Sequence, residues 1–337
     1  MTTSYQRMVL ASRPTGAVTP DNFRLETVNV PQPADGEVLV RVHYLSLDPY
    51  MRGRMIDSRS SYAQAQKLDE TMIGGTVGVV EVSHNPKFAP GDTVLGTFGW
   101  QEYGISDGRG LMKVDTRAIP MSAYLGPVGM PGVTAWYGLN RICTPKPGET
   151  VLVSAASGAV GSVVGQLAKA AGCRAVGIAG GPDKCHYVTS ELGFDACIDH
   201  RQHTDMQSMA KAIRAAAPKG VDGLFENVGG VGLDGALACM NPFGRVAVCG
   251  LIAGYDGASI PIHNVFPLVA MRLTVRGFIV SDHLDVWPQA LAELGRGVAE
   301  GTIRYRETVA EGLAAAPEAF IGMLKGRNFG KQLVKLA

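Results

Sequence analysis

Hydrophobic and polar positions follow two different patterns along the 337-residue chain. From about residue 148 onward, short apolar runs typical of buried parallel strands alternate with amphipathic segments typical of helices. Before about residue 125, β-like runs at 37–48, 75–83 and 92–98 are separated by turn clusters rich in Gly, Pro, Asn and Asp, without regular β/α alternation. The two patterns predict two domains of different class.

The second pattern predicts an α/β domain with a doubly wound parallel sheet, the Rossmann arrangement. The elements we expect are strands at 150–154, 174–179, 196–199, 221–226, 244–250 and 273–280, with helices at 161–171, 182–192, 204–216 and 231–240 between them. A further helix is expected near 284–300.

The first pattern predicts a partly open β-barrel. β-like pieces return at 305–312 and 331–336, so we expect the chain to cross back and complete the first domain. The predicted division is 1–125 plus 302–337 for the barrel domain and 126–301 for the inserted Rossmann domain. An insertion of this kind puts a cleft between two domains, where ligands commonly bind.

Composition excludes several classes of protein. The net charge is +1 and no Lys/Arg cluster stands out, so we expect no nucleic-acid partner. No run approaches the roughly 18 apolar residues of a membrane span, and the first residues do not read as a secretory signal. The six cysteines are scattered without a CxxC pair, as expected for reduced thiols. These features predict a cytoplasmic protein.

The stretch from Val151 to Gly161 carries the first chemical signal. A short apolar strand is followed by Ala156-x-Gly158-x-x-Gly161 and then by a helical pattern. Small residues let the backbone approach a pyrophosphate, and the helix N-terminus offers N–H groups and a positive dipole end. Because alanine replaces the first glycine of the usual motif, the prediction of a dinucleotide site depends on the repeated β/α units that follow.

The end of the second predicted strand indicates which dinucleotide binds. A classical NAD site has an acidic residue there, whereas this chain has Ala179-Gly180-Gly181. Lys184 follows in the first turn of the next predicted helix, where a cation is unfavourable against the helix dipole unless it meets an anion. Lys184 is either a solvated surface lysine or a ligand of a 2′-phosphate. The missing acid and the placed base together favour NADPH over NADH.

Five motifs give the chain a family resemblance: Leu47–Arg52, Gly129–Trp136, Ala155–Gly161, Glu226–Gly230 and Gly326–Gln332. They resemble, in order and over nearly the whole chain, the zinc-independent medium-chain reductases. The nearest group is the prostaglandin/leukotriene reductase-like NADPH-dependent double-bond reductases, including curcumin-reductase-like proteins. The resemblance implies a GroES-like domain split by a Rossmann domain, and usually a homodimer. The cysteines and histidines are not spaced as zinc ligands, so no metal is expected.

The resemblance also implies cofactor contacts, which we transfer by motif. They are Ser157, Gly158, Ala159 and Val160 under the pyrophosphate, Lys184 at the 2′-phosphate, Asn227 near the cofactor ribose, Cys249, Gly250, Leu251, Ile252 and Tyr255 in the turn after the fifth strand, Phe278, Ile279 and Val280 on the nicotinamide side, and Asn328 from the C-terminal segment. Where the family often has a tyrosine near adenine, this chain has Asp199-His200-Arg201. Whether His200 takes over the adenine contact, and whether Arg201 adds to phosphate binding, is open.

The implied reaction is hydride transfer from NADPH to the β-carbon of an enone or enal. Negative charge then develops on the carbonyl oxygen, which needs hydrogen-bond donors. Without a metal, hydroxyl groups must supply them, and Tyr50 and Tyr255 are the candidates. The alternative for each tyrosine is a packing role. The sequence assigns no proton donor for the α-carbon.

Two other functions stay open at this stage. The first is an NADPH-dependent quinone reductase, and the second is a non-catalytic NADPH-binding sensor or structural protein. Within the enone reading, the family's substrates include diarylheptanoids, alkenals and 15-oxo-prostaglandin-type enones. Loops 52–72 and 254–266 are expected to set the pocket size, with the polar segment 54–67 as a candidate lid.

Overall fold

The computed structural model describes residues 3–57 and 64–337, which fall into two compact units. Unit 1 comprises 1–125, 307–328 and 332–337, and unit 2 comprises 126–306 and 329–331. No helix in these described ranges combines the length and the apolar character needed to cross a membrane.

Unit 2 is built on a six-stranded parallel sheet with the order β10-β9-β8-β11-β12-β13. The strands are β8 (Thr150–Ser154), β9 (Arg174–Ala179), β10 (Ala196–Asp199), β11 (Val221–Glu226), β12 (Met240–Val248) and β13 (Thr274–Gly277). The strand order reverses between β8 and β11, so the predicted doubly wound sheet is confirmed. The carboxyl ends of β8, β9, β11 and β12 therefore lie along one edge of the sheet.

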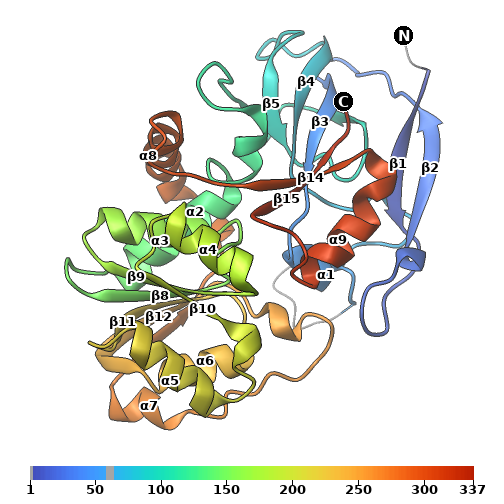
Figure 1. Ribbon diagram of the computed structural model, residues 1–337. Helices are drawn as coiled ribbons and strands as arrows, with labels where there is room; N and C mark the ends of the chain where they lie inside the picture. Colours follow the sequence, from blue (N-terminus) through green and yellow to red (C-terminus); the bar gives the residue numbers. More distant parts are fainter. Residues whose placement is uncertain (1–2, 58–63) are drawn as a thin grey trace. The chain divides into compact units, whose positions relative to one another are not determined.

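Helices cover both faces of this sheet (Figure 1). One face carries α2 (Met130–Tyr137), α3 (Gly161–Ala170), α4 (Pro182–Ser190) and α8 (Trp287–Ala299), and the other carries α5 (Met206–Ala216), α6 (Gly230–Leu237) and α7 (Phe266–Ala270). A separate apolar cluster fills the space on each side of the sheet. The central strands β8, β9 and β11 are buried on both faces, which explains their nearly continuous apolar sequences.

Unit 1 contains a mainly antiparallel sheet and a separate hairpin. The sheet order is β14-β15-β3-β4-β5-β7, with β6 also paired to β3, and β1 pairs β2. The strands are β1 (Ser4–Leu10), β2 (Phe23–Asn29), β3 (Val38–Ser46), β4 (Thr76–Ser83), β5 (Thr93–Gly96), β6 (Tyr103–Ser106), β7 (Met112–Lys113), β14 (Glu307–Glu311) and β15 (Lys331–Lys335). The C-terminal strand β15 pairs antiparallel with β3, so the chain returns to its first sheet.

Two short helices, α1 (Tyr50–Arg54) and α9 (Ala316–Leu324), pack on the core of unit 1. The indole of Trp100 stacks on Phe23 with ring centroids 5.3 Å apart and meets the edge of Phe320 at 5.6 Å. Met51 of α1 is fully buried in the same cluster. This burial fixes α1, and with it the Tyr50 side chain at the start of the helix.

Two strand predictions in unit 2 were wrong at their ends. The strand expected at 273–280 stops at Gly277, because its neighbour β12 ends at Val248, which is the residue paired with Gly277. The strand expected at 244–250 instead runs from Met240 to Val248. Residues 249–250 and 278–279 therefore belong to loops, and Val280 begins a 3₁₀ turn (Val280–Asp282).

Candidate functional site

In the glycine turn between β8 and α3, the backbone at Gly158 and Gly161 approaches the Ala155 carbonyl closely. Ala155 has a positive φ of 50°, and the Gly158 amide donates to the Ala155 carbonyl over 2.9 Å. A Cβ atom on Gly161 would lie 2.4 Å from the same carbonyl oxygen, so only glycine fits there. The helix α3 can therefore start directly behind the turn, and its first N–H groups, which lack partners within the helix, lie next to the turn.

The C-terminal segment Phe329–Lys331 belongs to unit 2 and lies against this turn. Gly330 forms a parallel bridge with Gly158, and the Phe329 ring meets the edge of the Tyr187 ring at 5.0 Å. The Arg306 guanidinium lies 4.8 Å from the Tyr187 ring centroid and 5.0 Å from that of Phe329. The motif Gly326–Gln332 thus includes a strap on the dinucleotide turn. The cofactor contact of Asn328, directly before the strap, stays a prediction.

The end of β9 has no acidic residue of its own, but a carboxylate from the next strand lies beside it. Asp199 accepts hydrogen bonds from the Gly181 amide at 2.8 Å and from the Arg201 amide at 3.1 Å. Desolvation opposes ionisation of Asp199, but these bonds outweigh it and lower its pKa. The Asp199 carboxylate therefore binds backbone amides of its own chain, and it links the loop after β9 to the loop after β10.

Three basic side chains gather around the diglycine that follows β9. Lys184 lies in the first turn of α4, as predicted. A Cβ on Gly180 would lie 2.9 Å from His200 Nε2, and one on Gly181 would lie 2.9 Å from Arg201 Nη1. Loss of hydration, followed by the charge of Arg201, lowers the pKa of Lys184. An anion bound at the diglycine would relieve this repulsion, so the residues fit a 2′-phosphate.

The end of β11 carries a buried carboxylic acid that the sequence analysis missed. Glu226 is 1% exposed, and its Oε1 atom accepts from Ser154 Oγ at 2.9 Å, the Val228 amide at 2.6 Å and the Gly229 amide at 2.8 Å. Burial raises the pKa of Glu226 in spite of these bonds. Asn227 donates to Ser154 through both its backbone and side-chain nitrogens. The network fixes the loop that carries Asn227.

The turn after β12 is attached to the same loop. The Cys249 amide donates to the Glu226 carbonyl over 2.8 Å, and the Ile252 amide donates to the Asn227 carbonyl over 3.2 Å. Burial, followed by the Glu226 charge, raises the pKa of the Cys249 thiol to about 12. The thiol is therefore protonated at neutral pH, and the turn presents mainly backbone and the partly exposed side chains of Leu251 and Ile252.

Tyr255 follows a 3₁₀ turn (Ile252–Gly254) and folds back over the end of β12. Its hydroxyl oxygen lies 3.2 Å from the position that a Cβ on Gly250 would occupy. This approach is possible because Gly250 has no side chain. The hydroxyl thus lies at the carboxyl edge of the parallel sheet, where doubly wound folds bind ligands.

Two of the three side chains predicted to line the nicotinamide side are largely buried. Phe278 is 8% exposed and packs on Tyr137 and Phe225, with ring centroids 5.3 and 6.2 Å away. Val280 is 7% exposed in the same cluster. Of the three, Ile279 has the partly exposed side chain, and the nicotinamide contact of all three stays a prediction.

Tyr50 lies in unit 1 as the first residue of α1. Its half-buried ring packs against the cluster that contains Met51, and the Arg54 guanidinium lies 5.8 Å from the ring centroid. The Asp48 carboxylate accepts from Ser46 Oγ, and the Asp48 carbonyl accepts the Met51 amide at 3.1 Å. The ring therefore has a packing role, and its hydroxyl chemistry stays a prediction. Of the expected lid at 54–67, residues 58–63 lie outside the described part of the chain.

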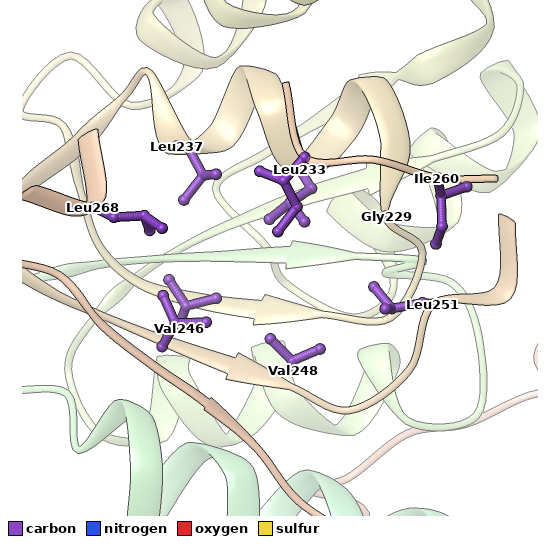
Figure 2. Close-up of a pocket in the computed structure, with 10 residues that line it drawn as sticks. Gly229, Leu233, Leu237, Val246, Val248, Leu251, Ile260 and Leu268 are labelled. Carbon is purple, nitrogen blue, oxygen red and sulfur yellow. The ribbon is translucent and has the colours of Figure 1, made fainter. Parts of the chain in front are cut away.

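An apolar cavity of about 90 Å³ lies on the α6 side of the sheet (Figure 2). Its walls come from α6, β12, β13 and the segment 251–268, and its lining residues are Gly229, Leu233, Leu237, Val246, Val248, Leu251, Ile260, Ile262, Leu268 and Val275. The lining has no titratable side chain, so it does not offer acid–base chemistry. Within the described ranges, no three His, Cys, Asp or Glu side chains cluster as a metal ion would require.

Comparison with known proteins assigns the chain to a family. Residues 6–114 match a family model described as the N-terminal domain of oxidoreductase, and residues 159–296 match one described as zinc-binding dehydrogenase. The NADPH-dependent curcumin reductase of Escherichia coli (strain K12) is 46% identical over 98% of this chain and 97% of its own length. The chain belongs to the medium-chain dehydrogenase/reductase family.

Other members of this medium-chain family match over almost the full length. The 2-alkenal reductase (NADP(+)-dependent) of Nicotiana tabacum is 39% identical over 99% of this chain and 98% of its own. The crystal structure of CurA in complex with NADPH from Vibrio vulnificus has a TM-score of 0.92 and 44% identity, covering 98% of this chain and 99% of that one. The family resemblance and the predicted combination of a GroES-like domain with a Rossmann domain are confirmed.

Proposed function

We propose that this chain is a cytoplasmic, NADPH-dependent reductase of the C=C bond of α,β-unsaturated ketones and aldehydes. The observation that carries the cofactor choice is the group of Lys184, His200 and Arg201 around Gly180–Gly181, where the nearby Asp199 carboxylate is held by the amides of Gly181 and Arg201. Full-length relatives named as NADPH-dependent curcumin reductase and 2-alkenal reductase support the reaction. When bound, NADPH supplies the hydride that adds to the β-carbon.

The chain's own contribution is to stabilise charge on the substrate carbonyl oxygen. We assign this role to the hydroxyls of Tyr255 and Tyr50, because preorganised donors aimed at a developing oxyanion lower the barrier. Support for Tyr255 comes from its position over Gly250 at the carboxyl edge of the sheet. Support for Tyr50 comes from the buried anchor of α1, which restricts the tyrosine at its start. The Asn227 loop and the turn after β12 lie at the same edge of the sheet as Tyr255, where we expect them to contact the cofactor.

A substrate and cofactor panel tests this function. The purified chain is mixed with NADPH or NADH and with 3-nonen-2-one, 1,4-benzoquinone or a saturated aldehyde, and loss of nicotinamide absorbance is followed. We expect oxidation with the enone, a strong preference for NADPH, and a saturated ketone as product. Turnover with the quinone but not the enone would favour a quinone reductase. Tight NADPH binding without turnover of any acceptor would favour a sensor or structural protein.

Removal of single hydroxyls tests the tyrosine roles. We expect Tyr255→Phe to lower kcat with the enone by roughly 100-fold, in the range measured for loss of one oxyanion donor, with little change in NADPH affinity. Tyr50→Phe is expected to lower kcat with the enone by roughly tenfold. Removal of the hydroxyl leaves the ring packing intact, so the fold should not change. Tyr124→Phe is the matched control, because that hydroxyl donates to the Asp115 carbonyl at 2.6 Å. Unchanged kcat in both variants would contradict the assignment.

We also propose that the functional form is a homodimer joined at β13. All four residues of β13 are exposed, and in the described structure β13 pairs only with β12. Phe266 and Val269 of α7 are 76% and 77% exposed, and Leu268 between them lines the same cavity as Val275 of β13. An open strand edge next to exposed apolar side chains fits a second copy of the same edge around a two-fold axis. Light scattering should give twice the chain mass, and Val269→Asp should give the monomer.

A further inference from the structure

Two cysteine thiols that the reductase chemistry does not use lie in direct contact. Cys185 is in α4 and Cys197 is in β10, and the Cys197 thiol donates to the Cys185 sulfur with the two atoms 3.2 Å apart. A disulfide needs sulfurs about 2.05 Å apart, so the pair must close by only about 1.2 Å. Side-chain torsions and a small shift of α4 can supply that distance.

The direct thiol contact, rather than exposure, distinguishes the pair from the chain's other cysteines, since Cys249 is also partly exposed. Cys143, Cys173 and Cys239 are buried, and their thiols point to backbone carbonyls at 3.5, 3.3 and 3.4 Å. Within the described residues, Cys185 and Cys197 are the pair whose thiols bond to each other, and both are partly exposed. The pair therefore has both the geometry and the access that a thiol reaction requires.

The position of the pair connects it with the basic cluster after β9. Cys185 directly follows Lys184, and Cys197 lies two residues before Asp199. The Asp199 carboxylate in turn holds the amides of Gly181 and Arg201. A covalent bond between the two cysteines would join the first turns of α4 to the end of β10, immediately beside the groups that surround the diglycine.

We propose that Cys185 and Cys197 form a reversible disulfide, and that this modification weakens NADPH binding. The first part stands on the thiol contact alone, whereas the effect on NADPH rests on the proposed function. Because closing the sulfurs draws the first turns of α4 toward β10, Lys184 shifts relative to the diglycine. We expect NADPH affinity to fall about five- to tenfold, the low end of coupling between neighbouring sites. By reciprocity, bound NADPH disfavours the disulfide by the same factor.

Hydrogen peroxide is a sufficient oxidant for the step. The Cys185 thiolate attacks one peroxide oxygen, the O–O bond breaks, and the products are a Cys185 sulfenic acid and, after protonation, water. The Cys197 sulfur then attacks the sulfenic sulfur, its S–H proton is lost, and hydroxide leaves as a second water. Two thiols and one peroxide thus give one disulfide and two waters. A dithiol reductant reverses the reaction by thiol–disulfide exchange.

The surroundings of the two thiols assign their order of reaction. Burial raises the pKa of both thiols, and the Asp199 carboxylate raises both further. The hydrogen bond from Cys197 partly offsets this for Cys185, so Cys185 is the better thiolate and the nucleophile. Since the thiolate is the reactive form, oxidation should be slow at neutral pH and should accelerate as the pH rises.

The test uses the purified full-length chain, first reduced with dithiothreitol and then exposed to hydrogen peroxide. Intact mass should fall by two hydrogens, and peptide mapping should link the peptides that hold Cys185 and Cys197. NADPH titration should show about five- to tenfold weaker binding in the oxidised form, with recovery after re-reduction. Cys185→Ser and Cys197→Ser should bind NADPH normally and resist the effect of peroxide, whereas Cys239→Ser should respond like the wild type.

The outcomes separate the two claims. Absence of the Cys185–Cys197 link after peroxide would overturn the modification site, and a link without a change in NADPH affinity would overturn its consequence. A reduced wild type that binds no NADPH would instead overturn the proposed function, while the mass map would still decide whether the disulfide forms.

Discussion

The ends of β9 and β11 lie on the same edge of one parallel sheet, yet they use polar groups in opposite ways. After β9, Lys184, His200 and Arg201 surround a bare diglycine, and the charges of Lys184 and Arg201 repel each other. After β11, the buried carboxyl of Glu226 accepts three hydrogen bonds from its own chain. The basic cluster after β9 is stabilised when an anion binds to it. The Glu226 network after β11 is stabilised by hydrogen bonds within the protein itself.

This difference separates cofactor binding from fold stability at two strand ends on the same edge of the sheet. Substitutions around the β9 diglycine should change cofactor affinity and leave the fold intact. Substitutions in the Glu226 network should change the free energy of unfolding first and affect catalysis through the position of the Asn227 loop.

The largest effect is expected for Glu226→Ala. It leaves the Ser154 hydroxyl and the amides of Val228 and Gly229 without their shared acceptor, which should lower the free energy of unfolding by about 3 kcal/mol. Glu226→Gln is the control, because its amide oxygen can still accept these bonds, and it should stay within about 1 kcal/mol of the wild type. Urea unfolding measures both. Equal stability of the alanine and glutamine variants would show that the network does not hold the loop.

At the β9 end, we expect Lys184→Ala to raise the KM for NADPH by about tenfold or more, the effect of losing one charge-assisted hydrogen bond. The KM for NADH and the unfolding midpoint should not change. Steady-state kinetics with both cofactors measures this, with the exposed Lys211→Ala on α5 as control. An equal rise in KM for both cofactors would contradict a 2′-phosphate contact.

A smaller effect in the same direction is expected for Arg201→Ala. Its backbone amide still donates to Asp199, so the loop should keep its shape while one cation is lost. We expect the KM for NADPH to rise about three- to tenfold, as for a partly exposed charge contact. Arg109→Ala, which removes an exposed arginine paired with Asp107 in unit 1, is the control. Unchanged cofactor preference would remove Arg201 from the basic cluster's function.

The smallest effect expected is a pH dependence of the free energy of unfolding that comes from the Glu226 carboxyl. Because the folded state raises the pKa of Glu226 above its ordinary 4.5, the folded state holds this proton more tightly than the unfolded state does. The contribution to stability is complete below pH 4.5 and is lost as the pH rises through the folded pKa. Glu226→Gln lacks this group, so it should gain stability relative to the wild type as the pH rises from 4.5 toward neutrality. A constant difference across that range would show that Glu226 has an ordinary pKa.

The elements that could be predicted are those whose own local sequence identifies them. The apolar runs and glycines predicted the six strands of the Rossmann sheet, and the sequence around Lys184 predicted its place in the first turn of α4. The interactions between strand ends could not be predicted in this way. Asp199 reaches Gly181 because the register pairs it with Ala179, and Glu226 reaches Ser154 because Phe225 pairs with Val153.

The burial of individual loop residues could not be predicted from the local sequence either, because it depends on residues distant in the chain. Phe278 continues an apolar run, and the run alone does not show that its ring packs on Tyr137 and Phe225, which come from a helix and a strand distant in sequence. A signal for the Glu226 network was present, since Ser154 and Glu226 are polar residues at the ends of apolar strands. It becomes meaningful only when β8 and β11 are known to be neighbours.

The most direct test of the central claim follows the hydride itself. NADPH carrying deuterium at the transferred nicotinamide position is incubated with the enzyme and 3-nonen-2-one, and the product is analysed by mass spectrometry and NMR. Double-bond reduction by this chain gives a saturated ketone with deuterium at the β-carbon. An unsaturated alcohol with deuterium at the former carbonyl carbon, or no deuterium transfer at all, would contradict double-bond reduction by this chain.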